Sequence, residues 1–356
     1  MKALSAFKYL SPIVFFILAF ISFNSHGILT WLPVILGFVV MPLGELFLKP
    51  NLLNLGQAEE EMAKTDKLYD YMLYFFIILL YPTIAYFLYH IKQNIAVDNV
   101  SWASVVGKTA SLGFLCGTFG INIAHELGHR VNKTEQRLAL AGLLTSLYMH
   151  FFTEHNKGHH KNVATHNDPA SSRYNENLYA FWLRTIYGSY ASAWHIANAE
   201  CIKKGNKIFS LKNEMVVFTA IQIAFVGLIF LAFGIVPTLF FVAAAVIGML
   251  LLETVNYIEH YGLMRKETAP GKYERTMPIH SWNSNHYLGR VMLFELSRHS
   301  DHHYLASRKY QILRHHSQAP QMPTGYPGMM LLSTIPPLWF MVMNPRVKAV
   351  MQAIES

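Results

Sequence analysis

Apolar residues occur in long, nearly uninterrupted runs in the first third of the chain and again between residues 214 and 257. A helix needs about 20 mostly apolar residues to cross the hydrocarbon core of a bilayer. Runs of this length predict six transmembrane helices, at about residues 8–23, 28–48, 69–91, 102–123, 214–233 and 236–257. A short polar turn, residues 24–27, separates the first two, so we interpret them as an uncleaved helical hairpin and not as a signal peptide.

Residues 136–153 form another apolar stretch, but polar side chains interrupt it. If this stretch crossed the bilayer, the histidines before and after it would lie on opposite membrane faces. We therefore expect a partly buried helix that does not span the membrane. The apolar, proline-containing tail after residue 322 is likewise expected to pack on the membrane surface.

Basic residues are distributed unevenly around these six predicted helices. Both termini share one side with the long segments 124–213 and 258–356, whereas the opposite segments, about 24–27, 92–101 and 234–235, hold one Lys or Arg among them, Lys92. Because basic loops are retained in the cytoplasm, we expect the long segments to be cytoplasmic. The chemistry is therefore expected on the cytoplasmic side of the membrane.

Composition agrees with a membrane protein. Of the 356 residues, 53% are hydrophobic and 14% are charged, whereas soluble domains carry roughly 25% charged residues. The net charge of +8 follows from basic cytoplasmic loops, and no phosphate-binding loop or RNA-binding motif supports a nucleic-acid partner. We therefore predict an all-α integral membrane protein with a cytoplasmic helical cap, and one catalytic domain over residues 1–356.

Histidine is concentrated where the chain is polar. Sixteen of the 18 histidines follow residue 120. Four clusters, "HELGH", "HNKGHH", "NYIEHYGL" and "RHSDHH", supply nine imidazoles: His125, His129, His155, His159, His160, His260, His299, His302 and His303. Neutral imidazole is the commonest metal ligand in proteins. Nine exceed the capacity of one ion, so the pattern predicts two metal ions with four or five nitrogens each.

Ligand histidines usually donate their second ring N–H to a carboxylate or carbonyl. Candidates for this supporting role are Glu126, Glu154, Asp168, Glu259, Asp301 and, among the other histidines, His286. Neighbours in a helix face different ways, so each acid is expected to serve a histidine of another cluster. Glu45, near the inner end of the second predicted helix, is either an interfacial residue or a further supporting group.

Three other interpretations of the histidines are weaker. "HELGH" fits the HExxH pattern of zinc proteases, but the remaining clusters would then have no purpose. Surface histidines would not gather in clusters on one membrane side. A metal transporter places its ligands near the membrane midplane, whereas these clusters lie at or beyond the ends of the predicted helices. Imidazole suits zinc, copper, iron and nickel, so ligand type alone does not select the metal.

The histidine clusters resemble the three histidine boxes of integral-membrane di-iron enzymes, which include fatty-acid desaturases and hydroxylases. The fuller strings "HELGHR", "EHNKGHH", "NYIEHYGL" and "RHSDHH", with "SWNSNH" (281–286) and "PTGYPGM" (323–329), resemble those of bacterial alkane 1-monooxygenases. The resemblance implies six membrane helices, two non-haem irons held by the nine histidines, and O2-dependent hydroxylation of the terminal methyl of medium-chain n-alkanes. Related enzymes acting on fatty acyl chains or methyl-aromatics would use nearly the same boxes.

The chain carries no redox relay of its own, because its two cysteines, Cys116 and Cys201, are far apart and no nucleotide fingerprint is present. The resemblance implies rubredoxin, reduced by a rubredoxin reductase, as the electron donor. Such small carriers are typically acidic, so a basic cytoplasmic surface would attract them. Two candidate surfaces are the group Lys203, Lys204 and Lys207 and the group Arg308, Lys309 and Arg314.

Overall fold

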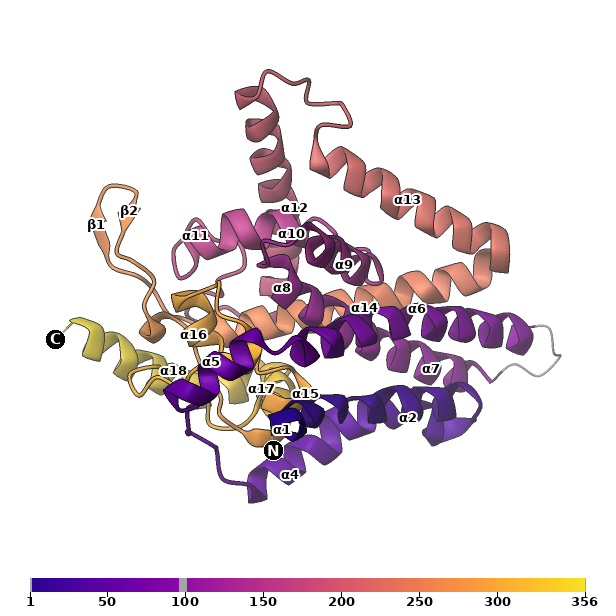
Figure 1. Cartoon of the computed structure of the whole chain (residues 1–356), viewed down its shortest axis with the longest axis horizontal. Coiled ribbons are helices and arrows are strands. Elements are labelled where there is room, and N and C mark those ends of the chain that lie inside the picture. Colours follow the sequence, from indigo (N-terminus) through magenta and orange to yellow (C-terminus); the bar gives the residue numbers. More distant parts are fainter. Residues whose placement is uncertain (1, 96–100, 356) are drawn as a thin grey trace. The chain divides into compact units, whose positions relative to one another are not determined.

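The computed structural model describes residues 2–95 and 101–355, and this part of the chain is mainly helical (Figure 1). Its helical segments include six that are long and apolar enough to cross a membrane: Ser5–Phe23, Gly27–Phe47, Lys67–Ile95, Trp102–Gly128, Glu214–Phe233 and Ile235–His260. The all-α fold with six candidate transmembrane helices is thereby confirmed. Of the predicted far-side segment 92–101, residues 96–100 lie outside the described residues.

Two of these helices extend further than the sequence predicted. The fourth was expected to end near residue 123 and the sixth near residue 257, but they continue to Gly128 and His260. The predicted cytoplasmic segments therefore begin inside helices. No proline or helix-ending glycine follows residue 123 or 257 directly, so nothing local stops either helix at the end of its apolar run. His125 and His260 consequently stand on rigid extensions of membrane helices.

The chain divides into two compact units, each assembled from several segments. Unit 1 comprises Met1–Val39, Asp70–Glu154 and Tyr190–Leu252, and unit 2 comprises Val40–Tyr69, His155–Ser189 and Glu253–Ser356. Helices α6 (Lys67–Ile95), α12 (Leu178–Lys203) and α14 (Ile235–His260) contribute residues to both. That residues 1–356 act as one catalytic domain stays a prediction.

Unit 1 contains most of the apolar helices. The described helices that lie wholly within unit 1 are α1 (Lys2–Phe7), η1 (Lys8–Leu10), α2 (Ile13–Phe23), η2 (Gly27–Trp31), α3 (Leu32–Ile35), α7 (Trp102–Leu115), the π-helix η4 (Cys116–Ile121), α8 (Asn122–Gly128), α9 (Lys133–Leu144), α10 (Phe151–Glu154) and α13 (Glu214–Phe233). The rings of Phe16, Phe76 and Phe119 pack together with centroids 5.1–5.6 Å apart. At another contact, a Cβ on Gly117 would lie only 2.9 Å from the carbonyl oxygen of Gly248, so small residues permit close helix packing.

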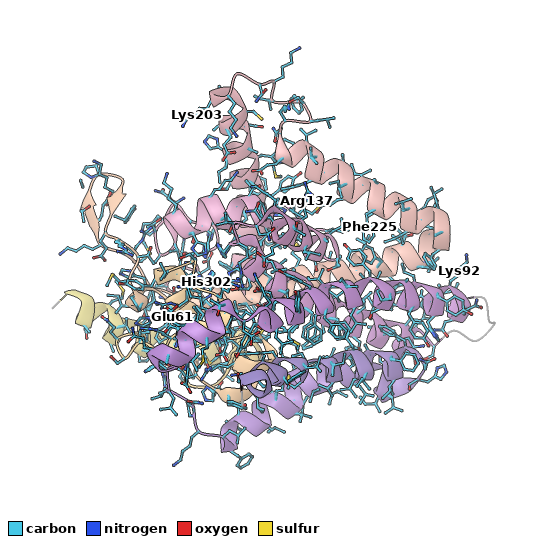
Figure 2. The ribbon with its side chains drawn as sticks, viewed as in Figure 1. Glu61, Lys92, Arg137, Lys203, Phe225 and His302 are labelled. Atoms are coloured by element: carbon cyan, nitrogen blue, oxygen red, sulfur yellow. The ribbon has the colours of Figure 1, made fainter. Side chains whose placement is uncertain are left out.

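Helices α6 and α13 contact each other at one end. Figure 2 shows Lys92 near the end of α6, and its Nζ donates a hydrogen bond of 3.2 Å to the carbonyl oxygen of Ala232 on α13. An ammonium group at a helix end can reach past the apolar zone in this way.

The stretch 136–153 is not one continuous helix. Helix α9 has 12 residues, which corresponds to a length of about 18 Å, well short of a hydrocarbon core about 30 Å thick. The chain then turns at Leu147, whose φ is 51°, before the short helix α10. This agrees with the prediction that the stretch does not span the membrane.

Unit 2 carries several short helices, one helix of 20 residues and the described strands. Its helices are α4 (Met41–Phe47), α5 (Gln57–Thr65), the π-helix η5 (His155–His159), α11 (His160–Asn162), α15 (Tyr287–Met292), α16 (His299–Tyr304), α17 (Tyr326–Ser333) and α18 (Pro336–Glu355). Strands β1 (Glu267–Ala269) and β2 (Lys272–Tyr273) form an antiparallel hairpin. Pro336 begins α18, a position that suits proline because its missing N–H needs no partner there.

Candidate metal centre

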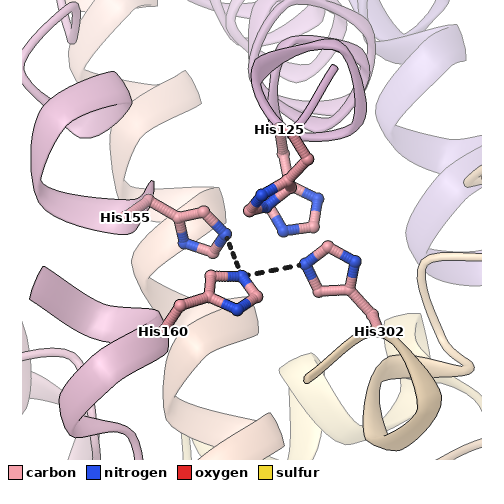
Figure 3. A group of neighbouring side chains, drawn as sticks. His125, His155, His160 and His302 are labelled. Carbon is pink, nitrogen blue, oxygen red and sulfur yellow. Dashed lines mark hydrogen bonds between the residues drawn. The ribbon is translucent and has the colours of Figure 1, made fainter. Parts of the chain in front are cut away.

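Three histidines of unit 2 converge through their Nε2 atoms. His160 Nε2 lies 3.0 Å from His155 Nε2 and 3.1 Å from His302 Nε2 (Figure 3). We call His155, His160 and His302 the three-histidine group. It joins the second and fourth sequence clusters, which are more than 140 residues apart in the chain.

A π-helix explains why His155 pairs with His160. The i, i+4 spacing of His155 and His159 predicts that these two rings share one face of an α-helix. Residues 155–159 instead form the π-helix η5, a wider turn that occurs mostly at functional sites. The wider turn brings residues five apart into register, so the Nε2 atoms of His155 and His160 meet. The His159 ring still stacks on His155, with centroids 5.1 Å apart, but its Nε2 faces His303.

A second set of imidazoles lies beside the first. His159 Nε2 is 3.2 Å from His303 Nε2, and His299 Nε2 is 3.3 Å from His260 Nε2. We call His159, His260, His299 and His303 the four-histidine group; each residue offers a ring nitrogen, and these four atoms lie within 4.8 Å of one another. All four residues are buried. The three histidines of α16, spaced i, i+3, i+4, thus belong to different groups: His302 to the three-histidine group, and His299 and His303 to the four-histidine group.

The nitrogen positions fit a metal better than they fit hydrogen bonds alone. Each neutral imidazole has one N–H and one lone pair, so convergent Nε2 atoms cannot all donate to one another. Burial, followed by the neighbouring imidazoles, holds the pKa of His303 well below its usual value, which keeps this ring in the neutral form that binds metals. Metal–nitrogen bonds of about 2.0–2.1 Å place adjacent ligand atoms roughly 2.9–3.4 Å apart, and the observed separations are 3.0–3.3 Å.

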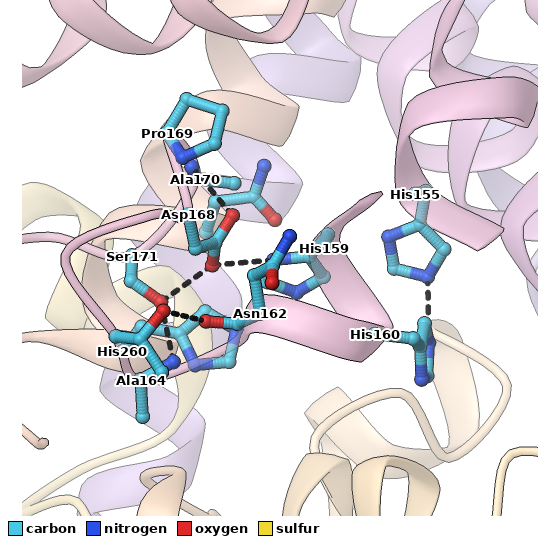
Figure 4. A network of polar contacts seen from close by, with 12 residues as sticks. His155, His159, His160, Asn162, Ala164, Asp168, Pro169, Ala170, Ser171 and His260 are labelled. Carbon is cyan, nitrogen blue, oxygen red and sulfur yellow. Dashed lines mark hydrogen bonds and ion pairs between the residues drawn. The ribbon is translucent and has the colours of Figure 1, made fainter. Parts of the chain in front are cut away.

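Asp168 orients one member of the four-histidine group. Its Oδ2 lies 2.8 Å from His159 Nδ1 and accepts a 2.6 Å hydrogen bond from Ser171 Oγ, while its Oδ1 accepts one from the Ala170 N–H (Figure 4). Burial raises the pKa of Asp168, but His159 and Ser171 together outweigh it and hold that pKa below the ordinary value. A carboxylate at Nδ1 keeps the proton there and leaves the Nε2 lone pair facing the group.

Glu259 reaches the same group from the end of α14. Its Oε2 lies 3.2 Å from His299 Nε2, and its Oε1 accepts a 2.8 Å hydrogen bond from the Tyr326 hydroxyl. Burial, and then the neighbouring Glu259 carboxylate, raise the pKa of Tyr326 well above its ordinary value, so this phenol remains a donor. Glu259 therefore contacts His299 of another cluster and not its neighbour His260, as the alternation of helix faces led us to expect.

Asp301 has a different role from the one expected. Its Oδ1 accepts hydrogen bonds from Arg308 Nη1 at 2.5 Å and from His316 Nε2 at 2.7 Å, and its Oδ2 accepts one from the Arg314 backbone N–H at 2.8 Å. It thereby fixes α16, which carries three candidate ligands, to the following loop. His316, which the sequence placed outside the ligand set, is thus part of the support of that helix.

The remaining candidates are divided between the two units. In unit 1, His125 and His129 stand on and directly after α8 with ring centroids 5.4 Å apart. Glu126 forms a 2.5 Å ion pair with Arg130, and Glu154 is buried at the end of α10. In unit 2, His286 Nδ1 lies 3.0 Å from Ser284 Oγ, and His286 belongs to neither histidine group of the described chain.

The chain is similar to proteins of known activity over most of its length. The model of the family described as fatty acid desaturase matches residues 100–332. An alkane 1-monooxygenase of Acinetobacter baylyi is 38% identical over 315 residues, 88% of this chain and 76% of the relative. The chain belongs to the alkane 1-monooxygenases of the fatty acid desaturase family.

Two further relatives show that the similarity extends to proteins named for different substrates. An alkane 1-monooxygenase 2 of Pseudomonas aeruginosa is 42% identical over 248 residues, 70% of this chain and 66% of the relative. The hydroxylase component XylM of a xylene/toluene monooxygenase from Pseudomonas putida is 28% identical over 263 residues, 72% of this chain and 68% of the relative. The family match contains all nine candidate ligands as well as Tyr326 and Asp168.

Sequence reasoning alone missed several residues that support the site. Ser171, Arg308 and Tyr326 each contact an acid of the centre, and no cluster of histidines or acids marks them in the sequence. Tyr326 lies within the string "PTGYPGM", which carried part of the resemblance to the alkane 1-monooxygenases but no assigned role. The resemblance of this string was the sequence feature that could have pointed to a role for Tyr326.

Proposed function

We propose that this protein hydroxylates the terminal methyl group of medium-chain n-alkanes to primary alcohols, using O2 and a pair of non-haem irons. The observation that supports this proposal most directly is the pair of convergent imidazole groups in a protein of the alkane 1-monooxygenase family. In the balanced reaction, one oxygen atom enters the C–H bond and the other leaves as water, with two electrons and two protons consumed. An unactivated C–H bond offers no acidic proton or leaving group, so bound iron would supply the activation of O2.

The four-histidine group would hold one ion. His159 is the best-prepared ligand of this group, since Asp168 fixes its tautomer. Glu259 adds a carboxylate beside His299, which offsets the charge of an ion bound by neutral rings.

The three-histidine group would hold the second ion, and we propose that His125 and His129 complete its ligands. Three nitrogens leave coordination positions open on an iron ion. His125, on α8, and His129, directly after it, are separated by about one helical turn, the spacing that lets neighbouring side chains share one ion. This completion gives the five and four nitrogens that the sequence led us to expect.

The apolar helices suit the proposed substrate. A hydrocarbon partitions into the bilayer with roughly 0.8 kcal/mol per methylene, and the chain has six helices able to lie in that phase. We propose the bacterial inner membrane as the location and its cytoplasmic face as the side of the metal centre, on the basis of the Lys and Arg distribution. The electron donor proposed is rubredoxin, reduced by its reductase.

Hydroxylation of a methyl-aromatic compound is the second candidate, favoured by the similarity to XylM. A competition assay decides between them: the purified membrane protein with a reducing system is given octane, xylene and a fatty acid together. We expect 1-octanol as the main product. A benzylic alcohol as main product would favour the second candidate, and a hydroxylated or desaturated fatty acid would place the chain with the acyl-modifying members of the family.

A further inference from the structure

A buried carboxylate on the second candidate span lies away from both histidine groups. Glu45, on α4, is 3% exposed. Its Oε1 accepts a 2.7 Å hydrogen bond from the backbone N–H of Gly289. Gly289 belongs to the first turn of α15, where backbone N–H groups have no partner within the helix. Glu45 therefore satisfies a donor that would otherwise be buried without one.

The other side of the same carboxylate faces α17. A Cβ built on Gly325 would overlap the Glu45 carboxyl group, so the backbone there lies directly against it and leaves no room for a side chain. Gly325 is the N-cap residue of α17. A helix N-terminus carries a partial positive charge, which a buried carboxylate stabilises. One side chain of the second span thus binds the start of one helix and packs directly against the start of another.

Helix α17 connects this contact to the metal centre. Its first residue, Tyr326, donates a 2.8 Å hydrogen bond to Glu259 Oε1, and Glu259 Oε2 lies 3.2 Å from His299 Nε2. That nitrogen faces His260 Nε2 at 3.3 Å, so it is an atom through which the four-histidine group would bind its ion. All of these residues belong to unit 2.

We propose that Glu45 is a positioning residue for the four-histidine group. By setting the start of α17 it places Tyr326, which in turn holds the Glu259 carboxylate beside the ligand nitrogens. The inference rests on the proposed binding of metal at this group and adds that the second span controls its geometry. Glu45 touches neither metal nor substrate, and its effect passes through Gly325, Tyr326 and Glu259.

The test measures iron binding and not only activity. Full-length protein in lipid nanodiscs is loaded with ⁵⁷Fe(II), and the affinity of each ion is measured by chelator competition, with Mössbauer spectra reporting the two sites separately. Glu45→Leu is expected to weaken one of the two ions about tenfold, as removal of an outer support usually does. Tyr326→Phe should give the same change in the same Mössbauer component. Glu45→Gln, which keeps an acceptor for Gly289, should bind both ions as the wild type does.

A matched control removes another buried carboxylate of unit 2. Glu253 accepts a 2.9 Å hydrogen bond from Thr185 Oγ1, so Glu253→Leu should lower the melting temperature without changing iron affinity. The glycine provides a second check. Gly325→Ala should weaken iron binding in the wild-type background but add nothing to Glu45→Ala, because the clash needs the carboxyl group.

The possible outcomes separate this inference from the proposed function. If the wild type binds no iron, the proposed function fails before any variant is compared. If the wild type binds two ions and Glu45→Leu or Tyr326→Phe leaves both affinities and both spectra unchanged, the positioning role of Glu45 is wrong. Should Glu45→Leu not fold, Tyr326→Phe and the comparison of Gly325→Ala between the wild-type and Glu45→Ala backgrounds decide by the same criteria.

Discussion

The Nδ1 atom of His159 lies 2.8 Å from Oδ2 of Asp168, and both side chains are buried. The carboxylate is itself held by the Ser171 hydroxyl, so the imidazole has one favoured tautomer and one favoured orientation. Of the acids that the sequence placed near the histidines, Asp168 makes the contact expected of a group that supports a ligand.

Asp168→Asn should therefore weaken metal binding at the four-histidine group. The amide can turn its NH2 toward Nδ1 and drive the ring proton to Nε2, which then cannot bind a metal. We expect a 10- to 100-fold loss of iron affinity or activity, measured by chelator competition and product formation. Glu267→Gln, at an exposed position of strand β1, is the control and should change neither quantity.

Each of the nine His→Ala changes at the proposed ligands should remove most activity and lower the iron content below two per chain. His260→Ala and His302→Ala test one residue from each group, and full iron content with normal turnover in either variant would show that its assignment is wrong. The control is His195→Ala, because His195 is exposed on α12. His316→Ala is unsuitable as a silent control, since His316 binds Asp301.

The sequence could reveal those features of this centre that depend on residues close together in the chain. The six spans and the set of imidazoles follow from local patterns, namely apolar length and the short spacing of histidines. The division of ligands does not, because the π-helix at residues 155–159 brings His155 Nε2 to His160 while His159 Nε2 faces His303, and local propensity does not predict such a helix. The contacts of Tyr326 with Glu259 and of His316 with Asp301 join distant segments, so no local pattern shows them.

Acid should destabilise the fold partly through His150, a buried histidine of unit 1 that lies outside both groups. Burial lowers its pKa from 6.5 to about 4. Between pH 4 and 6.5 the unfolded chain then binds more protons than the folded chain does. The neutral ring therefore makes its full contribution to the free energy of unfolding above pH 6.5, and this contribution is lost as the pH falls toward 4. From pH 7 to pH 5 the expected loss is about 2 kcal/mol.

The measurement for His150 compares thermal unfolding of the wild type and of His150→Phe at pH 7 and pH 5. The phenyl ring can keep the contacts that His150 makes with Tyr148 and Tyr190, whose ring centroids lie 4.2 and 5.2 Å away. The variant should lose less of its melting temperature on acidification. Equal losses in the two proteins would show that His150 titrates alike in the folded and unfolded chain.

The membrane topology can be tested by labelling single cysteines in intact cells. Positions 24–27 and 92–95 should react from the periplasm, and positions near 165, 205 and 310 only after the cells are permeabilised. A pair of sites at residues 130–135 and 161–166 examines the stretch 136–153 directly. Labelling of that pair from opposite sides would mean that this stretch spans the bilayer, and His125 and His129 could then not share a metal with His155.

The last prediction concerns the supply of electrons. The purified protein should not turn over with NADH alone, and should do so once rubredoxin and its reductase are added. Of the two basic surfaces, the group at Lys203, Lys204 and Lys207 is the better candidate, because these side chains are exposed at the end of α12 and just after it. Figure 2 shows Lys203 at this end of the helix. In the other group, Arg308 binds Asp301 and Arg314 binds Glu60, so their charges are already neutralised.

Lys203→Glu/Lys207→Glu should raise the KM for rubredoxin roughly tenfold with kcat unchanged, since the lost attraction slows association and not chemistry. In the wild type the same KM should rise with salt, because exposed charges are screened over about 8–10 Å near physiological ionic strength. Lys266→Glu/Lys272→Glu, at two exposed positions before and on strand β2, is the charge-matched control. Turnover with NADH and no partner would refute the external donor, whereas a KM indifferent to salt and to both lysines would move the docking site elsewhere on the protein.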